Sequence, residues 1–232
     1  MMWLALILSA AEYEGGKPGT GTILGRVLLD KLPAPKKYAV TKNADKCGRE
    51  KADQAVIYSS DKGLKNVVVW IDNVRVGKDP IHDTVVLKNI TCVYEPRVSV
   101  AGVGATLELR NYDGLQMSAA GFLRPPVFGF TGAAGTPLFN VALPVKGLTA
   151  KRKMDKPGLI DIRTDSGQPW MQAWVWVFDQ PYAAVSDEGG YFSLDKVPPG
   201  EVILNVWHET LGYKSEKLVV PATDPARVEL VL

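Results

Sequence analysis

The stretch GLIDIRTDSGQPWMQAWVWVFD, residues 158–179, contains two apolar runs joined by a short polar loop. Apolar and polar residues alternate in GLIDIR, and aromatic and β-branched residues dominate QAWVWVFD, so both runs are typical of β-strands. Residues 164–171 between them carry small polar side chains and a methionine. All-β proteins often present ligands from such loops. The stretch therefore predicts two strands and a candidate ligand loop.

Similar short runs recur along the whole chain between clusters of Gly, Pro, Asn and Asp, for example TILGRVLL, NVVVWIDNV, ATLELRN, EVILNVW and RVELVL. This spacing is typical of β-sandwiches. Helical periodicity is absent except in residues 47–57, where a turn or a short helix is expected. With 232 residues, the chain is long enough for two domains. We therefore expect an all-β protein of two sandwiches.

Charge is nearly balanced, with 27 Lys+Arg against 25 Asp+Glu, which disfavours a nucleic-acid binder with one large basic face. Residues 17–51 are nevertheless basic and residues 179–229 acidic. Two solvated faces are the simpler explanation of this asymmetry, and orientation on a charged partner is the alternative.

The N-terminal segment, residues 1–21, begins with the apolar run MMWLALILSAA. It is similar to a secretory signal sequence but has no basic residues before the run, and it is too short to span a bilayer. We expect a cleaved signal, a short anchor at a membrane surface, or a buried N-terminal segment. A cleaved signal or a membrane anchor predicts a periplasmic or extracytoplasmic protein.

Cysteine and histidine are rare. Cys47 and Cys92 are the two cysteines, and in a chain that leaves the cytoplasm they predict either one disulfide or two buried thiols. His82 and His208 are the two histidines, so zinc sites and histidine-based triads are nearly excluded. No enzyme activity is expected. Adjacent residues of a strand point to opposite faces, so His208 and Glu209 do not converge on one site.

The C-terminal part resembles a known module. AWVWVFDQPYAAVSDEGGYFSLDKVPPGEVILNVWHETLGY, residues 173–213, is similar to the carboxypeptidase-regulatory-like domain, a small prealbumin-like sandwich. The resemblance implies a structural or adhesive role and no catalysis. It sets the second domain at residues 172–232.

The preceding part, residues 22–171, resembles the blue-copper cupredoxins, a Greek-key sandwich, in its segments GATLELRNYDGLQMS and LFNVALPVKGLTAKRKMDKPGLIDIRTDSGQPWM. The likeness is to extracytoplasmic bacterial proteins that fuse such a domain to the module above. The segments CGREK and TCVYEPRV are similar to their cysteine-bearing segments, which implies a bridge between Cys47 and Cys92.

The copper ligands of that family are missing. Asn111 and Asp113 are retained, but the positions of the two histidines and the cysteine carry Met117, Gln168 and Thr164, and only the weak axial ligand, Met171, is present. A blue-copper site needs a thiolate and two imidazoles. We therefore expect no metal or other cofactor, with Thr164 and Gln168 hydrogen bonded across the old cavity and Met117 and Met171 filling it.

Residues 114–139, GLQMSAAGFLRPPVFGFTGAAGTPLF, predict a long apolar loop because Gly and Pro interrupt it. Its candidate docking residues are Phe122, Leu123, Val127, Phe128 and Phe130; alternatively, these rings cover the protein's own sandwich. Trp174 and Trp176 share one strand face and predict either a sugar platform or an inter-sheet core or domain junction.

These features together predict a structural or docking subunit of a membrane-bound electron-transfer complex, respiratory or photosynthetic, whose partners are the protein subunits of that complex. The alternatives are a copper electron carrier with an unusual site and a carbohydrate or envelope binder.

Overall fold

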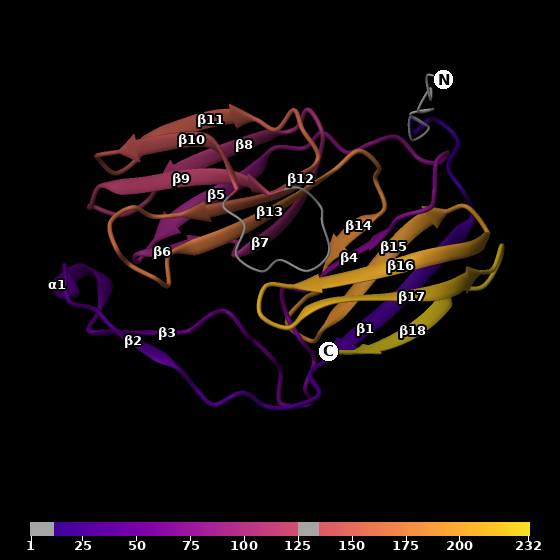
Figure 1. Cartoon of the computed structure of the whole chain (residues 1–232), viewed down its shortest axis with the longest axis horizontal. Coiled ribbons are helices and arrows are strands. Elements are labelled where there is room, and N and C mark those ends of the chain that lie inside the picture. Colours follow the sequence, from indigo (N-terminus) through magenta and orange to yellow (C-terminus); the bar gives the residue numbers. More distant parts are fainter. Residues whose placement is uncertain (1–11, 125–134) are drawn as a thin grey trace, which may run out of the picture.

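The computed structural model describes residues 12–124 and 135–232, and nearly all of their regular structure is β-strand. Four sheets make up two sandwiches that lie side by side along the long axis of the molecule (Figure 1). The predicted all-β sandwich fold is confirmed.

The first sandwich pairs a five-stranded with a four-stranded sheet. The five-stranded sheet, in spatial order β10-β9-β12-β13-β7, consists of Thr136–Leu143, Met117–Arg124, Gly158–Arg163, Gln172–Phe178 and Val98–Gly102. The four-stranded sheet, in the order β11-β8-β5-β6, consists of Thr149–Lys153, Thr106–Asn111, Val85–Ile90 and Val93–Glu95. Alternate apolar side chains of both sheets meet in one buried core, among them Leu87, Leu107, Ile160 and Val175.

The second sandwich pairs a four-stranded with a three-stranded sheet. The four-stranded sheet, in the order β14-β4-β16-β17, consists of Ala183–Val185, Val68–Ile71, Gly200–His208 and Gly212–Val220. The three-stranded sheet, in the order β15-β1-β18, consists of Tyr191–Val197, Gly21–Leu28 and Ala226–Val231. Its separate core includes Ile23, Val27, Leu204 and Leu230.

The strand pairings do not follow the contiguous ranges 22–171 and 172–232. Strand β1 pairs with β15 and β18, and β4 pairs with β14 and β16, so two N-terminal strands lie in the second sandwich. Strand β13 pairs with β12 and β7 in the first. The first sandwich is thus built from chain that lies between β4 and β14. Hydrogen bonding across long distances in the chain, which a local pattern does not reveal, decides this arrangement.

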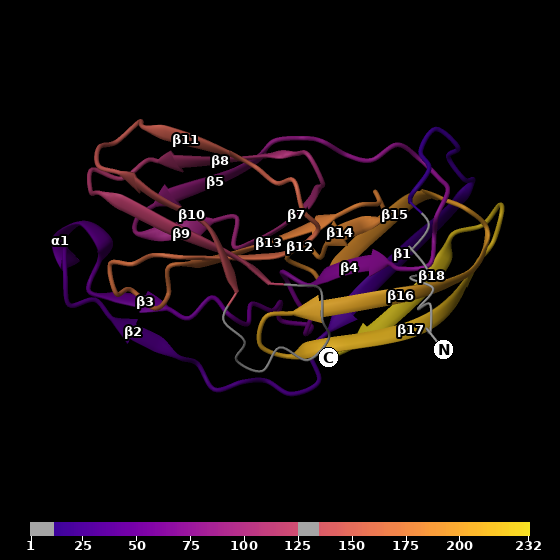
Figure 2. The same cartoon turned by 45° about the horizontal axis from the view of Figure 1, so that its top comes forward.

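A two-stranded ribbon of β2 (Lys37–Ala39) and β3 (Glu50–Ala52) carries the short helix α1 (Ala44–Cys47). Both views place this arm beside the first sandwich, at the end away from the second (Figures 1 and 2). A disulfide joins Cys47 to Cys92, with 5.4 Å between the Cα atoms, so the predicted bridge is confirmed.

The contact between the sandwiches is aromatic. Trp176 of β13 lies 5.1 Å from Trp70 of β4 and 5.6 Å from Trp207 of β16, measured between ring centroids. Trp174 meets Trp207 edge-on at 5.6 Å. Trp176 is 2% exposed and Trp174 half-buried, so these rings are a domain junction. The sugar-platform interpretation is wrong for Trp176, because its ring is not accessible.

The expected long loop over residues 114–139 is also wrong in its extent. Strand β9 occupies a central position between β10 and β12, although it contains Gly121. A Cβ at residue 121 would lie 2.3 Å from the Phe139 ring, so the glycine lets that ring cover β9. The connection between β9 and β10 therefore spans only residues 125–135.

Candidate functional site

The loop of residues 164–171 joins β12 to β13 at one end of the first sandwich. The residues at the copper-ligand positions of the resemblance gather here in part: Thr164, Gln168 and Met171 line one open pocket of about 500 Å³, together with Arg163, Gly167, Pro169 and Gln172. Met117 begins β9, and its neighbour Ser118 is hydrogen bonded to Thr164 at 3.0 Å between hydroxyl oxygens. The four positions thus lie at the same end of the sandwich.

Hydroxyl and amide groups of the loop bond to one another. The Thr164 hydroxyl lies 2.7 Å from the Ser166 hydroxyl, which donates to Gln168 Oε1 at 2.7 Å. Thr164 and Gln168 are therefore connected through Ser166 along the loop. Thr164 also bonds to Ser118 of β9. The backbone closes the same loop, because Met171 N–H donates to the Gln168 carbonyl at 3.1 Å.

Both methionines are buried in the core of the first sandwich, Met117 at 1% and Met171 at 5% exposure. Their thioethers therefore act as apolar filling. In the same core Tyr94 donates its hydroxyl to the Ser118 carbonyl, and burial holds the pKa of Tyr94 above its usual value. That these methionines fill a former copper cavity stays a prediction.

The retained Asn111 and Asp113 hold the backbone of this end together. The Asn111 amide donates to the carbonyls of Leu115 and Leu143, each at 2.8 Å. The Asp113 carboxylate accepts from the N–H groups of Thr91 and Cys92, each at 2.7 Å. These two residues thus have a structural use that needs no metal.

The predicted docking residues are only partly within the described ranges. Phe122 and Leu123 lie in β9 and are half-buried, and Leu123 packs against the core of the first sandwich. Val127, Phe128 and Phe130 lie outside the described residues. At the ligand-loop end, Tyr112, Val145 and Leu148 are exposed, at 42%, 57% and 41%.

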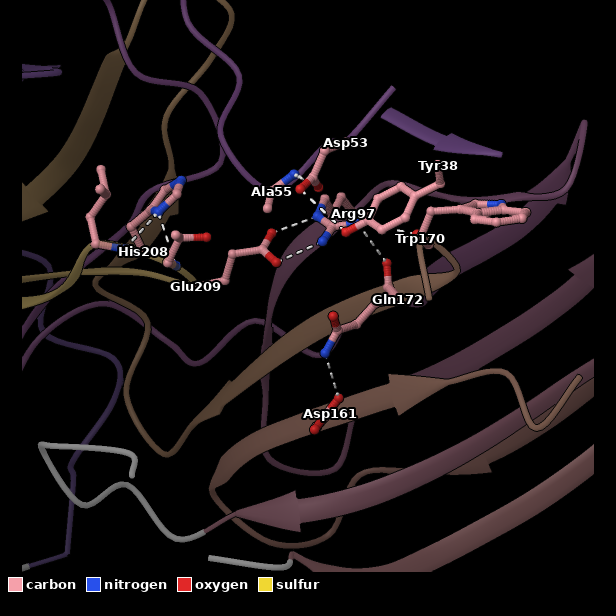
Figure 3. Close-up of polar contacts among 11 residues, drawn as sticks. Tyr38, Asp53, Ala55, Arg97, Asp161, Trp170, Gln172, His208 and Glu209 are labelled. Carbon is pink, nitrogen blue, oxygen red and sulfur yellow. Dashed lines mark hydrogen bonds and ion pairs between the residues drawn. The ribbon is translucent and has the colours of Figure 1, made fainter. Parts of the chain in front are cut away.

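Two buried ionic groups next to the loop were not predicted. Arg97 forms a two-point ion pair with Glu209, at 2.5 Å and 2.7 Å, and its other terminal nitrogen lies 3.4 Å from the carbonyls of Trp170 and Gln172 (Figure 3). Both side chains are almost fully buried. Because Arg97 follows β6 and Glu209 follows β16, this pair joins the ligand loop of one sandwich to the other sandwich.

The second group surrounds Asp161 in the middle of β12, whose side chain is fully buried. Its carboxylate accepts from Arg124 at 2.7 Å, from Gln172 at 3.2 Å and from Arg163. A partial signal for it was visible in the sequence, because GLIDIR places a carboxylate between two isoleucines in the middle of a strand.

His208 and Glu209 do not form a common site. The Glu209 carboxylate faces Arg97, while the Nδ1 atom of the buried His208 accepts from the N–H groups of Thr210 and Leu211 at 3.2 Å and 3.3 Å (Figure 3). Burial, and next the charge of Arg97, lowers the pKa of His208 to about 4. This histidine is neutral at pH 7 and serves the structure.

Within residues 12–124 and 135–232, no group of three or more His, Cys, Asp or Glu side chains could hold a metal ion. The same two ranges contain no helix that is long and apolar enough to cross a membrane.

No family model matches the chain, and no curated protein matches it either. Solved structures with a weak likeness to parts of the chain include cupredoxins. A Cu-containing nitrite reductase from Thermus scotoductus SA-01 is 16% identical with a TM-score of 0.30, over 56% of this chain and 27% of the reductase. A purple cupredoxin from Nitrosopumilus maritimus is 19% identical with a TM-score of 0.31, over 41% of this chain and 98% of its own. An amicyanin mutant in its reduced state is 18% identical with a TM-score of 0.31, over 40% of this chain and 81% of the amicyanin. These scores are too low to decide function, so the sandwich assignment rests on the strand pairings.

Proposed function

We propose that the chain is a non-enzymatic docking subunit of a membrane-bound electron-transfer complex, respiratory or photosynthetic, and that it works outside the cytoplasm. In this proposal the first sandwich is a cupredoxin-like domain with a degenerate copper site, and the second is a carboxypeptidase-regulatory-like domain. The N-terminal segment holds the protein at the membrane surface or directs its export.

One observation supports the proposal that the first sandwich has no copper site. At the four ligand positions stand two neutral polar side chains that are bonded within the loop and two buried thioethers. Copper(II) in a blue site is held by a thiolate and two imidazoles, which supply the strong donors that hydroxyl and amide oxygens do not. A site filled in this way keeps the sandwich and leaves its surface available for protein contacts.

The docking role is supported by apolar surface. The exposed Tyr112, Val145 and Leu148 adjoin the ligand loop end, and large apolar side chains on a rigid scaffold are good interface anchors. The sequence candidates Phe128 and Phe130 belong to the connection between β9 and β10, which has the composition of a binding loop.

A copper titration separates this proposal from the second candidate, a copper electron carrier with an unusual site. The wild-type chain is expected to bind no stoichiometric Cu(I) or Cu(II) at micromolar concentration and to show no intense visible band. The variant Met117→His/Thr164→Cys/Gln168→His is the positive control, since with Met171 it restores the complete donor set. One tightly bound copper per wild-type chain would establish the carrier instead.

Association is tested with tagged full-length chain and detergent-solubilised membranes of the source organism, read by mass spectrometry. Subunits of one electron-transfer complex should be enriched. Phe128→Ala/Phe130→Ala should abolish the enrichment at unchanged melting temperature, whereas Leu211→Ala/Val219→Ala, which removes exposed apolar groups of the second sandwich, should not. Retention by both variants, or enrichment of no such subunit, contradicts the docking role.

A further inference from the structure

The edge strands of the sheets differ in how they are protected against pairing with another chain. Unpaired edges attract further strands, and charged side chains on an edge oppose this. Four of the edge strands that the structure describes carry charges: β11 has Lys151, Arg152 and Lys153; β15 has Asp195 and Lys196; β17 has Lys214, Glu216 and Lys217; β18 has Arg227 and Glu229.

Three other edges are short or covered. Strands β6 and β14 have three residues each. Strand β7 is covered by the segment before β5, since a Cβ at Gly102 would lie 2.1 Å from the carbonyl oxygen of Ile81. In these cases little of the backbone is open to a new partner.

Strand β10 has none of these protections. It is eight residues long, TPLFNVAL, contains no charged residue, and ends the five-stranded sheet with β9 as its one strand neighbour in the described part of the chain. Leu138 is 44% exposed, and Asn140 and Ala142 are exposed on the same face. Both views show β10 beside β9 in the first sandwich (Figures 1 and 2).

We propose that β10 is a strand-addition edge at which a second copy of this chain places its own β10 antiparallel, so that the two five-stranded sheets become continuous. An uncharged edge is self-complementary, because no like charges meet across a two-fold axis. A second copy therefore fits this edge without any change of sequence. The inference does not depend on the proposed function.

The geometry limits the new ladder to the second half of the strand. Pro137 has no N–H to donate, and the register shifts between Pro137 and Phe139. Residues 139–142 remain for regular pairing, because the Leu143 carbonyl already accepts from the Asn111 amide, and the two-fold axis lies near residues 140–142. Side chains on one face are then opposed across the axis at about 4.5–5.5 Å between Cβ atoms.

The first test is sedimentation of the full-length chain over a range of concentrations. A monomer–dimer equilibrium is expected, and Asn140→Lys should weaken it about tenfold or more, since it places two like charges close to each other across the two-fold axis. The matched control is Val219→Lys, which adds the same charge to the exposed edge β17 and should leave the equilibrium unchanged.

The second test locates the contact. Because Cys47 and Cys92 are bonded to each other, the double variant Asn140→Cys/Ala142→Cys carries the only free thiols of the chain. If the two-fold axis passes through residue 140 or 142, the cysteine introduced at that position faces its own copy, and if it passes through residue 141, the cysteine introduced at position 140 faces the one at position 142 of the second copy. Mild oxidation should therefore yield a covalent dimer in each case. The control variant Ser215→Cys/Lys217→Cys on β17 should stay monomeric.

Circular dichroism checks that each variant is folded. A monomer at all concentrations, or a dimer that Asn140→Lys leaves intact, overturns the proposal.

Discussion

At the scale of single residues, several polar side chains are buried in positions that serve the packing of the fold. Asp161 is neutralised by two arginines, and Arg97 by Glu209. His208 differs because it is buried without an opposite charge, and its Nε2 atom has no hydrogen-bond partner. Its neutral form is therefore favoured in the folded protein, and its protonation opposes folding.

His208 predicts a loss of stability in mild acid. The pKa of its imidazole is about 4 in the folded chain against an ordinary value of 6.5. Between these pH values the unfolded chain binds a proton that the folded chain does not, so stability falls as pH drops from about 6.5 to about 4 and levels off below. The shift corresponds to about 3 kcal/mol.

The measurement is urea unfolding from pH 7 to pH 4. His208→Asn keeps an acceptor for the backbone N–H groups and should flatten the pH dependence. His82→Asn, which removes the exposed histidine, should leave the slope as in the wild type. An unchanged slope in His208→Asn would assign the acid sensitivity to other groups.

At the scale of elements, the sequence predicts those strands whose formation depends on neighbouring residues in the chain. It does not predict features that depend on contacts between distant segments. The two strands of residues 158–179 were predicted from their local patterns. The even cysteine count left one disulfide and two buried thiols open, and only the resemblance implied the bridge that the structure contains. Strand β9 was missed because Gly121 and two nearby prolines have the composition of a loop, while the Phe139 ring that covers the glycine comes from the neighbouring strand. The Arg97–Glu209 pair joins residues 112 positions apart, and no spacing pattern reports such a contact.

The arm of β2, β3 and α1 depends on its disulfide. Residues 37–52 bury few side chains of their own, and Cys47 attaches them to Cys92, whose carbonyl accepts from Trp170 Nε1 at 2.9 Å. Replacing both cysteines by alanine should lower the free energy of unfolding by about 4 kcal/mol, because a loop with a sequence separation of 45 is released in the unfolded chain.

Chemical denaturation of Cys47→Ala/Cys92→Ala beside the wild-type chain measures this loss. Hydrogen exchange should show the earliest increase in residues 37–52. A loss well below 1 kcal/mol would mean that the arm is held by its other contacts.

At the scale of the whole molecule, the buried pair of Arg97 and Glu209 fastens the two sandwiches beside their aromatic junction. Removal of one partner leaves an unpaired buried charge, which costs about 3–5 kcal/mol. We expect this loss for Arg97→Met and for Glu209→Leu. The double variant should recover most of it, since two apolar side chains of similar volume need no compensation.

A double-mutant cycle in urea measures the coupling. If both single variants unfold in one transition at wild-type stability, the pair does not hold the sandwiches together. An added early transition in Arg97→Met alone would show that the sandwiches separate before they unfold.

The distribution of strands also bears on how a nascent chain folds as it leaves the ribosome. Strands β1 and β4 are synthesised early, yet their hydrogen-bonding neighbours β14, β15, β16 and β18 all follow residue 182. The intervening sandwich can close first, while these early strands have no sheet to join until the last fifth of the polypeptide emerges. Protection during translation is therefore expected to matter most for β1 and β4, and any truncation before residue 226 leaves an apolar N-terminal strand without one of its two neighbours.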